Sequence, residues 1–240
     1  GDLGYKPQAG KSLFRPTDIA VSPSGALYIA GWGAHYGSIY ASFGGADSKA
    51  KKNYGRVFRI FHKERPLVQR KDWLTAKRNK PHADWTFEEL LEDLGEQVPA
   101  WRVSAQDELI GRGAKHRLDV IKALESGKLS EGQETWAAWA LGRMPGWPSD
   151  AEYAFGKWSK PGARVSLNLR VQSVRIWGES GEIKAFKYVA ARLDDKEPRV
   201  RFAAALALRN LKELERGAEQ PLVQALSSET DRVTFYTQWH

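Results

Sequence analysis

The order of apolar and polar residues changes character along the chain. Up to residue 62, short apolar runs are separated by turn residues; from residue 85 onward, apolar residues recur at helical spacing. Short runs bounded by Gly and Pro predict strands, whereas recurrence every three or four residues predicts helices. The sequence therefore predicts a β-rich module over 1–62, a basic linker over 63–84 and a helical domain over 85–240.

Three strands are expected in the front module. The runs Asp18–Val21 and Ala26–Ala30 flank the turn sequence Ser22–Gly25, whose proline suits the second turn position and whose glycine can take a positive φ. This arrangement predicts a hairpin. The run Gly55–Phe61 alternates apolar with basic residues, which predicts a half-exposed third strand. Three strands of this length need a partner to cover their apolar face.

A short signature recurs through the helical part and predicts a repeat. Each copy sets an arginine, or threonine in one degenerate copy, before an apolar and alanine-containing run in the first turn of a helix. Steps of 33, 35, 31 and 31 residues separate the copies, which fits a solenoid of two-helix units that resembles HEAT repeats. We expect the arginine to bond to a neighbouring turn or carboxylate. The aligned positions are Arg102, Thr135, Arg170, Arg201 and Arg232.

Other local signals support helices in this region. Thr86 and Glu89 have capping-box spacing, and apolar stripes precede the breaks at Ser126–Gly127 and Asp194–Asp195. Trp136 and Trp139 lie three residues apart, so they share a helix face that we expect in the core between repeats. The last unit runs to the end of the sequence before its second helix could be complete and without a polar cap, so we expect the solenoid to be truncated there or its end to be covered by something else.

A Gly- and Pro-rich stretch, Met144–Gly162, is predicted to be an irregular insertion between repeats. It contains the aromatic residues Trp147, Tyr153 and Trp158. Two interpretations are open: these rings line a carbohydrate-binding surface, or they pack the insertion against the solenoid.

Charge is distributed unevenly. The net charge is +8, and residues 1–80 hold 15 Lys and Arg against 5 Asp and Glu, which leaves 22 against 24 for the remainder. A basic front could meet an anionic partner, or it could be a solvated face joined to a basic linker. Nucleic-acid binding is the weakest of the functional hypotheses, because no nucleic-acid motif or alternating aromatic platform accompanies the charge.

Several chemistries are excluded or have no support. The chain has no cysteine, which rules out disulfides, thiolate metal sites, a cysteine nucleophile and covalent haem attachment within these residues. The five histidines lack metal-ligand spacing, so we predict no metal site. No apolar run is long enough to form a transmembrane helix.

The front residues carry a resemblance to a known family. The segment Phe14–Ala30, followed by Trp32 and by Gly55–Ile60, resembles one blade of a sugar-dehydrogenase-like or NHL-like propeller. It is most similar to the final blade of large planctomycete and verrucomicrobial proteins of the membrane-bound dehydrogenase or haem-binding type. That family usually has aspartate where this chain has Ser24 and Gly31, so no carboxylate ligand is expected at the second position.

The resemblance implies a particular parent protein. In that family, the propeller is followed by HEAT-like repeats and then by a cytochrome c domain with a CxxCH motif. It implies a periplasmic or secreted, quinone- or cytochrome-linked sugar or alcohol dehydrogenase, with haem c and a quinone or Ca²⁺ as cofactors. No cofactor is expected within this chain itself. Its expected partners are the rest of the propeller and the cytochrome-type domain or another protein subunit, and carbohydrate is a further candidate.

Candidate site residues in the front module follow from residue type. His35 and Tyr36 lie in a long loop over 31–54; they could face a substrate, with His35 as general base for hydride abstraction, or the loop could pack on a neighbouring blade. Arg56 opens the third strand, where it could reach an anionic cofactor or remain a surface arginine.

Two hypotheses of function are therefore better supported than nucleic-acid binding. In the first, the chain is part of an extracytoplasmic dehydrogenase, and its repeats act as spacer and protein-interaction surface. In the second, it is a non-catalytic scaffold that binds protein or carbohydrate. The predicted fold class is mixed: a propeller-type blade of antiparallel strands followed by a HEAT-like α-solenoid.

Overall fold

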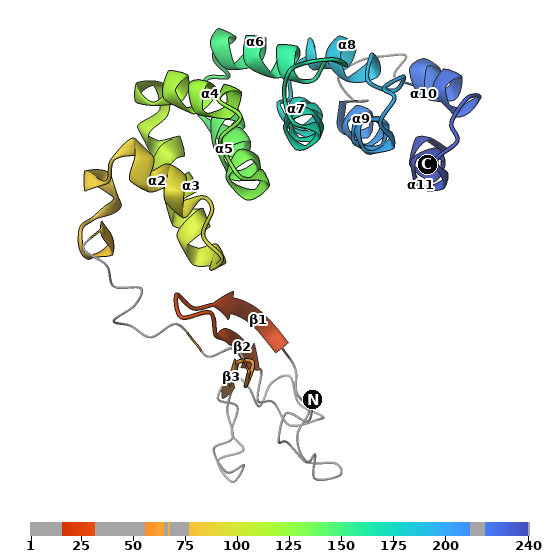
Figure 1. Ribbon diagram of the computed structural model, residues 1–240. Helices are drawn as coiled ribbons and strands as arrows, with labels where there is room; N and C mark the ends of the chain where they lie inside the picture. The colour runs from red at the N-terminus through yellow and green to blue at the C-terminus, as the bar shows by residue number, and fades with distance from the viewer. Residues whose placement is uncertain (1–15, 32–55, 65–66, 68–76, 212–218, 240) are drawn as a thin grey trace, which may run out of the picture. The chain divides into compact units, whose positions relative to one another are not determined.

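A computed structural model describes residues 16–31, 56–64, 67, 77–211 and 219–239 (Figure 1). The chain divides into two compact units: residues 1–80 with 97–101, and residues 81–96 with 102–240. The division at residue 80 falls within the stretch predicted to be a linker, which contains the short 3-10 helices η2 (Lys77–Asn79) and η3 (His82–Asp84).

The first unit contains an antiparallel sheet in the order β1-β2-β3. Its strands are β1 (Pro16–Val21), β2 (Leu27–Gly31) and β3 (Arg56–Ile60). The predicted hairpin is confirmed: the Gly25 amide donates to the Ser22 carbonyl at 2.9 Å, and Gly25 has φ +85°. The predicted third strand is also present.

One face of this sheet is apolar. Ile19 pairs with Ile29, which pairs with Phe58, so the three side chains share a face because alternate residues point to the same side. Ile19 is 62% exposed. A propeller blade typically has four strands, and the described residues form three. A propeller blade therefore remains a prediction.

The second unit is a stack of helix pairs. Each of the later pairs joins a first helix to a second helix, and successive second helices contact one another. The helices are α2 (Phe87–Asp93), α3 (Pro99–Arg112), α4 (Arg117–Glu125), α5 (Glu131–Arg143), α6 (Ser149–Trp158), α7 (Leu167–Glu179), α8 (Ala185–Ala190), α9 (Pro198–Leu211), α10 (Glu219–Leu226) and α11 (Arg232–Trp239), with the 3-10 turn η4 (Gly113–Lys115) before α4.

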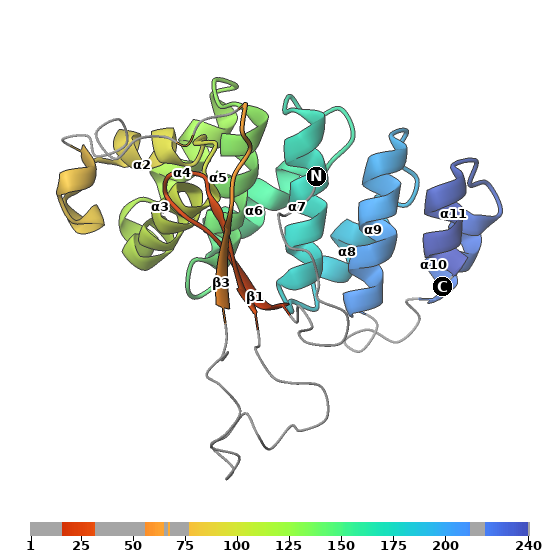
Figure 2. The ribbon, with the colours of Figure 1, turned by 90° about the horizontal axis from the view of Figure 1, so that it is seen from below.

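The helices lie in two rows (Figure 1). We call α4, α6, α8 and α10 the first-helix row, and α5, α7, α9 and α11 the second-helix row. Figure 2 shows the second-helix row with its members side by side. The signature positions lie in the second helix of successive pairs, from Arg102 in α3 to Arg232 in α11. The predicted two-helix repeat is therefore present.

Local sequence explains where several helices begin. The Thr86 hydroxyl accepts from the Glu89 amide at 3.1 Å while Glu89 accepts from the Thr86 amide at 2.8 Å, which confirms the predicted capping box. Ser130 and Gln133 form a second capping box at the start of α5. Gly127 has φ +67°, a conformation that lets the chain reverse after α4.

The predicted irregular insertion is wrong in one respect: residues 149–158 form α6, the first helix of a pair. Ala151, Ala154, Phe155 and Trp158 occupy positions i, i+3, i+4 and i+7, and all are buried. The Gly and Pro residues that suggested a loop lie outside this helix, except Gly156. The longer repeat step of 35 is accommodated in the turns that flank α6.

The core consists mainly of alanine, leucine and valine side chains, together with a few large aromatic rings. Alanines and two glycines let the second helices approach closely. A Cβ atom on Gly142 would lie 2.5 Å from Ile176 Cγ2, and one on Gly178 would lie 2.7 Å from the backbone Cα of Ala207. No helix in the described part of the chain is both long and apolar enough to cross a bilayer.

Candidate interaction site

The residues expected to serve a catalytic propeller are only partly described. His35 and Tyr36 lie outside the described residues. Arg56 is in β3, where its backbone pairs with Gly31, and its side chain is not described. Their proposed roles therefore remain predictions.

The aromatic residues of the 144–162 stretch do not together form an exposed binding surface. Trp158 is 0% exposed, and its indole N–H donates to Glu125 Oε1 at 3.3 Å. Trp147 stacks on Phe155 at a centroid distance of 5.7 Å, and only Tyr153, 75% exposed, faces solvent. A sugar needs an open ring face, so the carbohydrate-facing interpretation is wrong for Trp158. The packing interpretation describes Trp147 and Trp158.

Two of the signature arginines pair with carboxylates of the same chain. Arg170 lies 3.4 Å from Asp195 Oδ1, and Arg201 lies 2.6 Å from Glu229 Oε1, each carboxylate coming from the next helix pair. Arg201 also donates to the Asp195 carbonyl at 2.9 Å. The hydrogen bond from Arg201 holds the pKa of Glu229 below its usual value, although burial opposes this shift. The expected bond to a neighbouring carboxylate is thus confirmed at these two positions.

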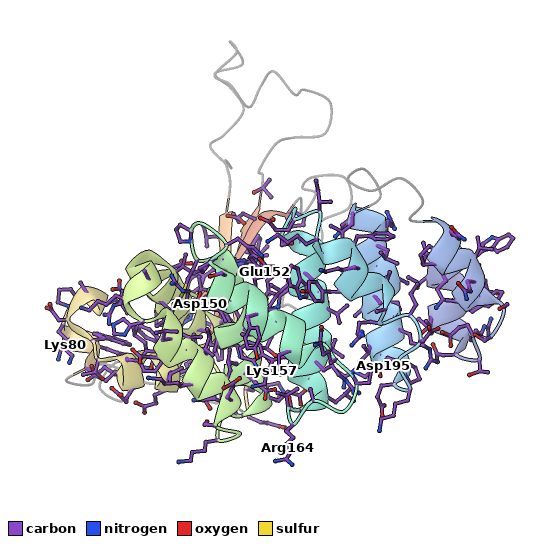
Figure 3. All side chains as sticks on the ribbon, turned by 90° about the horizontal axis from the view of Figure 1, so that it is seen from above. Lys80, Asp150, Glu152, Lys157, Arg164 and Asp195 are labelled. Carbon is purple, nitrogen blue, oxygen red and sulfur yellow. The ribbon has the colours of Figure 1, made fainter. Side chains whose placement is uncertain are left out.

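Three ion pairs join charges of the first-helix row to partners about one repeat away. Figure 3 labels Asp150, Glu152 and Lys157 along α6. The Arg117–Asp150, Lys157–Glu125 and Lys184–Glu152 pairs have N–O distances of 2.7, 2.8 and 2.7 Å. The hydrogen bond from Lys157 lowers the pKa of Glu125. These pairs neutralise each other and leave little net charge for a ligand.

The second-helix row differs, because two of its arginines gather around one indole. Trp139 of α5 is partly buried, and Arg143 and Arg175 are exposed. Their guanidinium carbons lie 5.3 and 5.6 Å from the centroid of the Trp139 ring, within the range of a cation–π interaction. Arg143 comes from the next turn of the same helix, and Arg175 comes from α7. We call this cluster the Arg143–Arg175 site.

Amide side chains hold the cluster in place. The indole N–H of Trp139 donates to Gln172 Oε1 at 3.0 Å, and Arg175 donates to the same oxygen at 3.3 Å. Arg143 donates to Gln106 Oε1 at 3.4 Å. Both glutamines are buried, so the groups that orient the indole and the arginines are themselves fixed.

A hollow of about 210 Å³ lies beside Arg143 and Trp139. Trp139, Gly142, Arg143, Ile176 and Glu179 line it. Gly142 lines the hollow without a side chain of its own, and a Cβ atom at this position would collide with Ile176. The Glu179 carboxylate accepts from Asn210 at 3.0 Å, so the lining of the hollow carries one negative charge as well as the positive charge of Arg143.

The two arginines retain unused hydrogen-bonding capacity. A guanidinium carries five N–H donors, and in the described part of the chain Arg143 and Arg175 each make one long hydrogen bond and no ion pair with a carboxylate. Each can still make a bidentate contact with an anion. This distinguishes them from Arg170 and Arg201, whose guanidinium groups face acidic residues of the same chain.

The Arg143–Arg175 site was not predicted from the sequence, although the spacing of its residues is a signal for it. Trp139 and Arg143 are four residues apart on one helix, and Arg175 follows 32 residues after Arg143, close to one repeat length. The two tryptophans of α5 were expected in the core between repeats. Trp136 and Trp139 are partly buried and pack against the core, and each also has an arginine over its ring; Arg102 lies 5.4 Å from the centroid of Trp136.

A second, wider hollow lies at Phe87 and His116. The two rings stack at 5.5 Å, and His116 Nδ1 lies 3.2 Å from Asp119 Oδ2. The residues that line it include no Ser, Thr or Cys that this histidine could activate. Among the described residues, no group of three His, Cys, Asp or Glu side chains could hold a metal ion.

Comparison with known proteins gives only a distant structural similarity. No protein-family model matches the chain, and no curated protein is significantly similar to it. A solved structure of the complex of CpcE and CpcF of phycocyanin lyase from Nostoc sp. is similar over 62% of this chain and 94% of that chain, with 14% sequence identity and a TM-score of 0.48.

Proposed function

We propose that the helical part of this chain is a non-catalytic scaffold whose second-helix row binds a protein partner. The observation that carries the proposal is the Arg143–Arg175 site, where two arginines without a carboxylate partner among the described residues flank a partly exposed tryptophan. Trp and Arg are the residues most enriched at the energetic centres of protein interfaces.

The contrast between the two rows supports this choice of face. The first-helix row pairs its charges internally, so docking there would break ion pairs before forming new ones. The Arg143–Arg175 site is preorganised by buried glutamines, so little side-chain freedom is lost when a partner binds. A helix-pair stack presents such a site on a rigid framework.

The dehydrogenase-like parent, with its periplasmic or secreted location, haem c and quinone or Ca²⁺, remains a prediction from the resemblance of the front module. The three-stranded sheet is compatible with it. The assay that tests it is dye-linked oxidation of sugars and alcohols by a propeller that includes this module.

Site-specific photo-crosslinking tests the scaffold. A photoreactive phenylalanine analogue replaces Glu179, at the rim of the hollow, or Tyr153, which is exposed on α6 in the first-helix row. In an extract of the source cells, we expect defined protein adducts from position 179 and none of them from position 153. The adducts should disappear when Arg143→Glu and Arg175→Glu are added, and binding of the identified protein should be lost in calorimetry. Adducts that are the same from both positions, or that persist in the arginine variant, would contradict the proposal.

A further inference from the structure

We infer that the partner presents an acidic segment whose carboxylates pair with Arg143 and Arg175, and that an adjacent apolar side chain enters the hollow beside Arg143. This inference rests on the proposed function and adds the chemistry of the partner to it.

The charge of the site favours a carboxylate. Two guanidiniums lie near one ring, and each has donors left for a planar anion. Each guanidinium can donate to a carboxylate, which has two oxygens with about four lone-pair sites. Such a carboxylate would supply the ion pair that Arg143 and Arg175 lack among the described residues.

The surroundings of the Trp139 indole disfavour cationic ligands and sugars. Cationic ligands are recognised by stacking on an aromatic face, but the chain's own guanidiniums already lie over Trp139. A sugar would also need an open ring face. The ring therefore contributes by holding the arginines and through its own partly exposed surface, and a cation or a sugar would have to displace the arginines to stack on it.

The volume of the hollow limits the size of the apolar group that the partner can insert. Its volume of about 210 Å³ is below the 300–1,000 Å³ of pockets that enclose a small molecule. It can take one side chain, with Ile176 and Gly142 as apolar floor. Glu179 also lines the hollow and disfavours an acidic side chain inside it, so the side chain that enters should be apolar.

The overall charge of the repeats argues against a nucleic acid or a sulfated polysaccharide. Residues 81–240 hold 22 Lys and Arg against 24 Asp and Glu, so they provide no general attraction for a polyanion. Binding to a phosphate backbone requires many neutralised phosphates. Two arginines are enough for one carboxylate.

Fluorescence anisotropy on the full chain tests the inference. The probe is a labelled Gly-Ser peptide with two adjacent glutamates followed by one phenylalanine, and the reference peptide has glutamines in place of the glutamates. We expect the acidic peptide to bind about tenfold more tightly, the difference corresponding to one charge-assisted contact, and its affinity to fall as salt rises.

Variants identify the residues responsible. Arg143→Gln and Arg175→Gln should each weaken the acidic peptide about fivefold to tenfold, Arg143→Lys should weaken it less, and Glu179→Gln should strengthen it about twofold. Arg199→Gln is the matched control: Arg199 is exposed near the start of α9 and should leave binding unchanged. Circular dichroism and thermal unfolding of each variant verify that the fold is retained.

Three results would overturn the inference. The glutamine peptide binds as tightly as the acidic one, no peptide binds, or a single-stranded oligonucleotide or heparin competes with the acidic peptide at equal charge concentration. If position 179 still yields arginine-dependent protein adducts in the crosslinking experiment, the scaffold function stands and only the acidic chemistry of the partner is wrong.

Discussion

Arg201 of α9 and Glu229, in the turn before α11, form a two-point ion pair. Nη2–Oε1 and Nε–Oε2 distances are 2.6 and 2.7 Å, and the Glu229 side chain is 1% exposed. Such a bidentate contact ties the last described helix pair to the one before it. Because each pair in a stack contacts only its neighbours, stability passes along the row through contacts of this kind.

Loss of the arginine should destabilise the end of the stack. Arg201→Met leaves the Glu229 carboxylate buried with only amide donors, and we expect a loss of about 3 kcal/mol. Amide hydrogen exchange should show the loss first in α10 and α11, since neighbouring pairs unfold together. The double variant with Glu229→Gln should be more stable than Arg201→Met alone. If α11 exchanges no faster in Arg201→Met, the ion pair does not hold the terminal pair in place.

The same pair predicts an acid-sensitive contribution to stability. The hydrogen bond from Arg201 is the largest influence on the pKa of Glu229; burial opposes it, and the net effect lowers the pKa below the ordinary 4.5. A carboxyl group with a lower pKa in the folded state stabilises the fold fully above its unfolded pKa, and this contribution is lost as pH falls through the folded pKa. We therefore expect the wild type to exceed Glu229→Gln in stability near neutral pH, with the difference shrinking below about pH 4.5. Urea unfolding of both proteins across this range measures it, and a pH-independent difference would contradict the assignment.

Two glycines should respond differently to alanine. At Gly178 the new Cβ would meet the Cα of Ala207 at 2.7 Å, which only a shift of the helix backbone can relieve, so we expect destabilisation of about 1–3 kcal/mol. At Gly142 the obstacle is the side chain of Ile176, and Ile176→Leu, which removes the Cγ2 atom, should partly rescue Gly142→Ala.

Gly132 provides the matched control for this experiment. A Cβ there meets only Ser130 Oγ at 4.0 Å, so Gly132→Ala should stabilise α5 by about 0.5–1 kcal/mol through helix propensity. Thermal unfolding of the three alanine variants gives the comparison. Equal effects at Gly178 and Gly132 would show that α7 and α9 do not need close approach.

Local chemistry explains which elements could be predicted from sequence. The hairpin at Ser22–Gly25 and the capping box of Thr86 depend on residues that are close in the chain. The repeat was predictable because the spacing between its copies is regular even where their residues differ. The role of the signature arginine was also predictable, because a buried guanidinium needs a carboxylate or carbonyl partner.

The candidate site could not be predicted in the same way. Arg143 and Arg175 converge on Trp139 only because α5 and α7 pack with a particular rotation, which depends on Gly142 and its neighbours rather than on any local pattern. α6 was missed for a different reason: glycines and prolines at its borders obscured an apolar stripe of four residues. In both cases the deciding contacts join residues about one repeat apart.

Aromatic substitutions in α6 separate a core role from a surface role. Trp158 is fully buried, and its ring meets Phe155 edge-on at 5.5 Å, so Trp158→Ala should cost about 3–5 kcal/mol through the cavity it leaves. Tyr153 lies five residues earlier and is 75% exposed, so Tyr153→Ala should change stability by no more than about 0.5 kcal/mol. Trp158→Phe should fall between the two, because it keeps most of the packing but removes the hydrogen bond to Glu125. Denaturant unfolding gives all three values. If Trp158→Ala left stability unchanged and instead abolished binding to a glycan array, the ring would be a ligand contact, and its place in the core of the helix stack would be wrong.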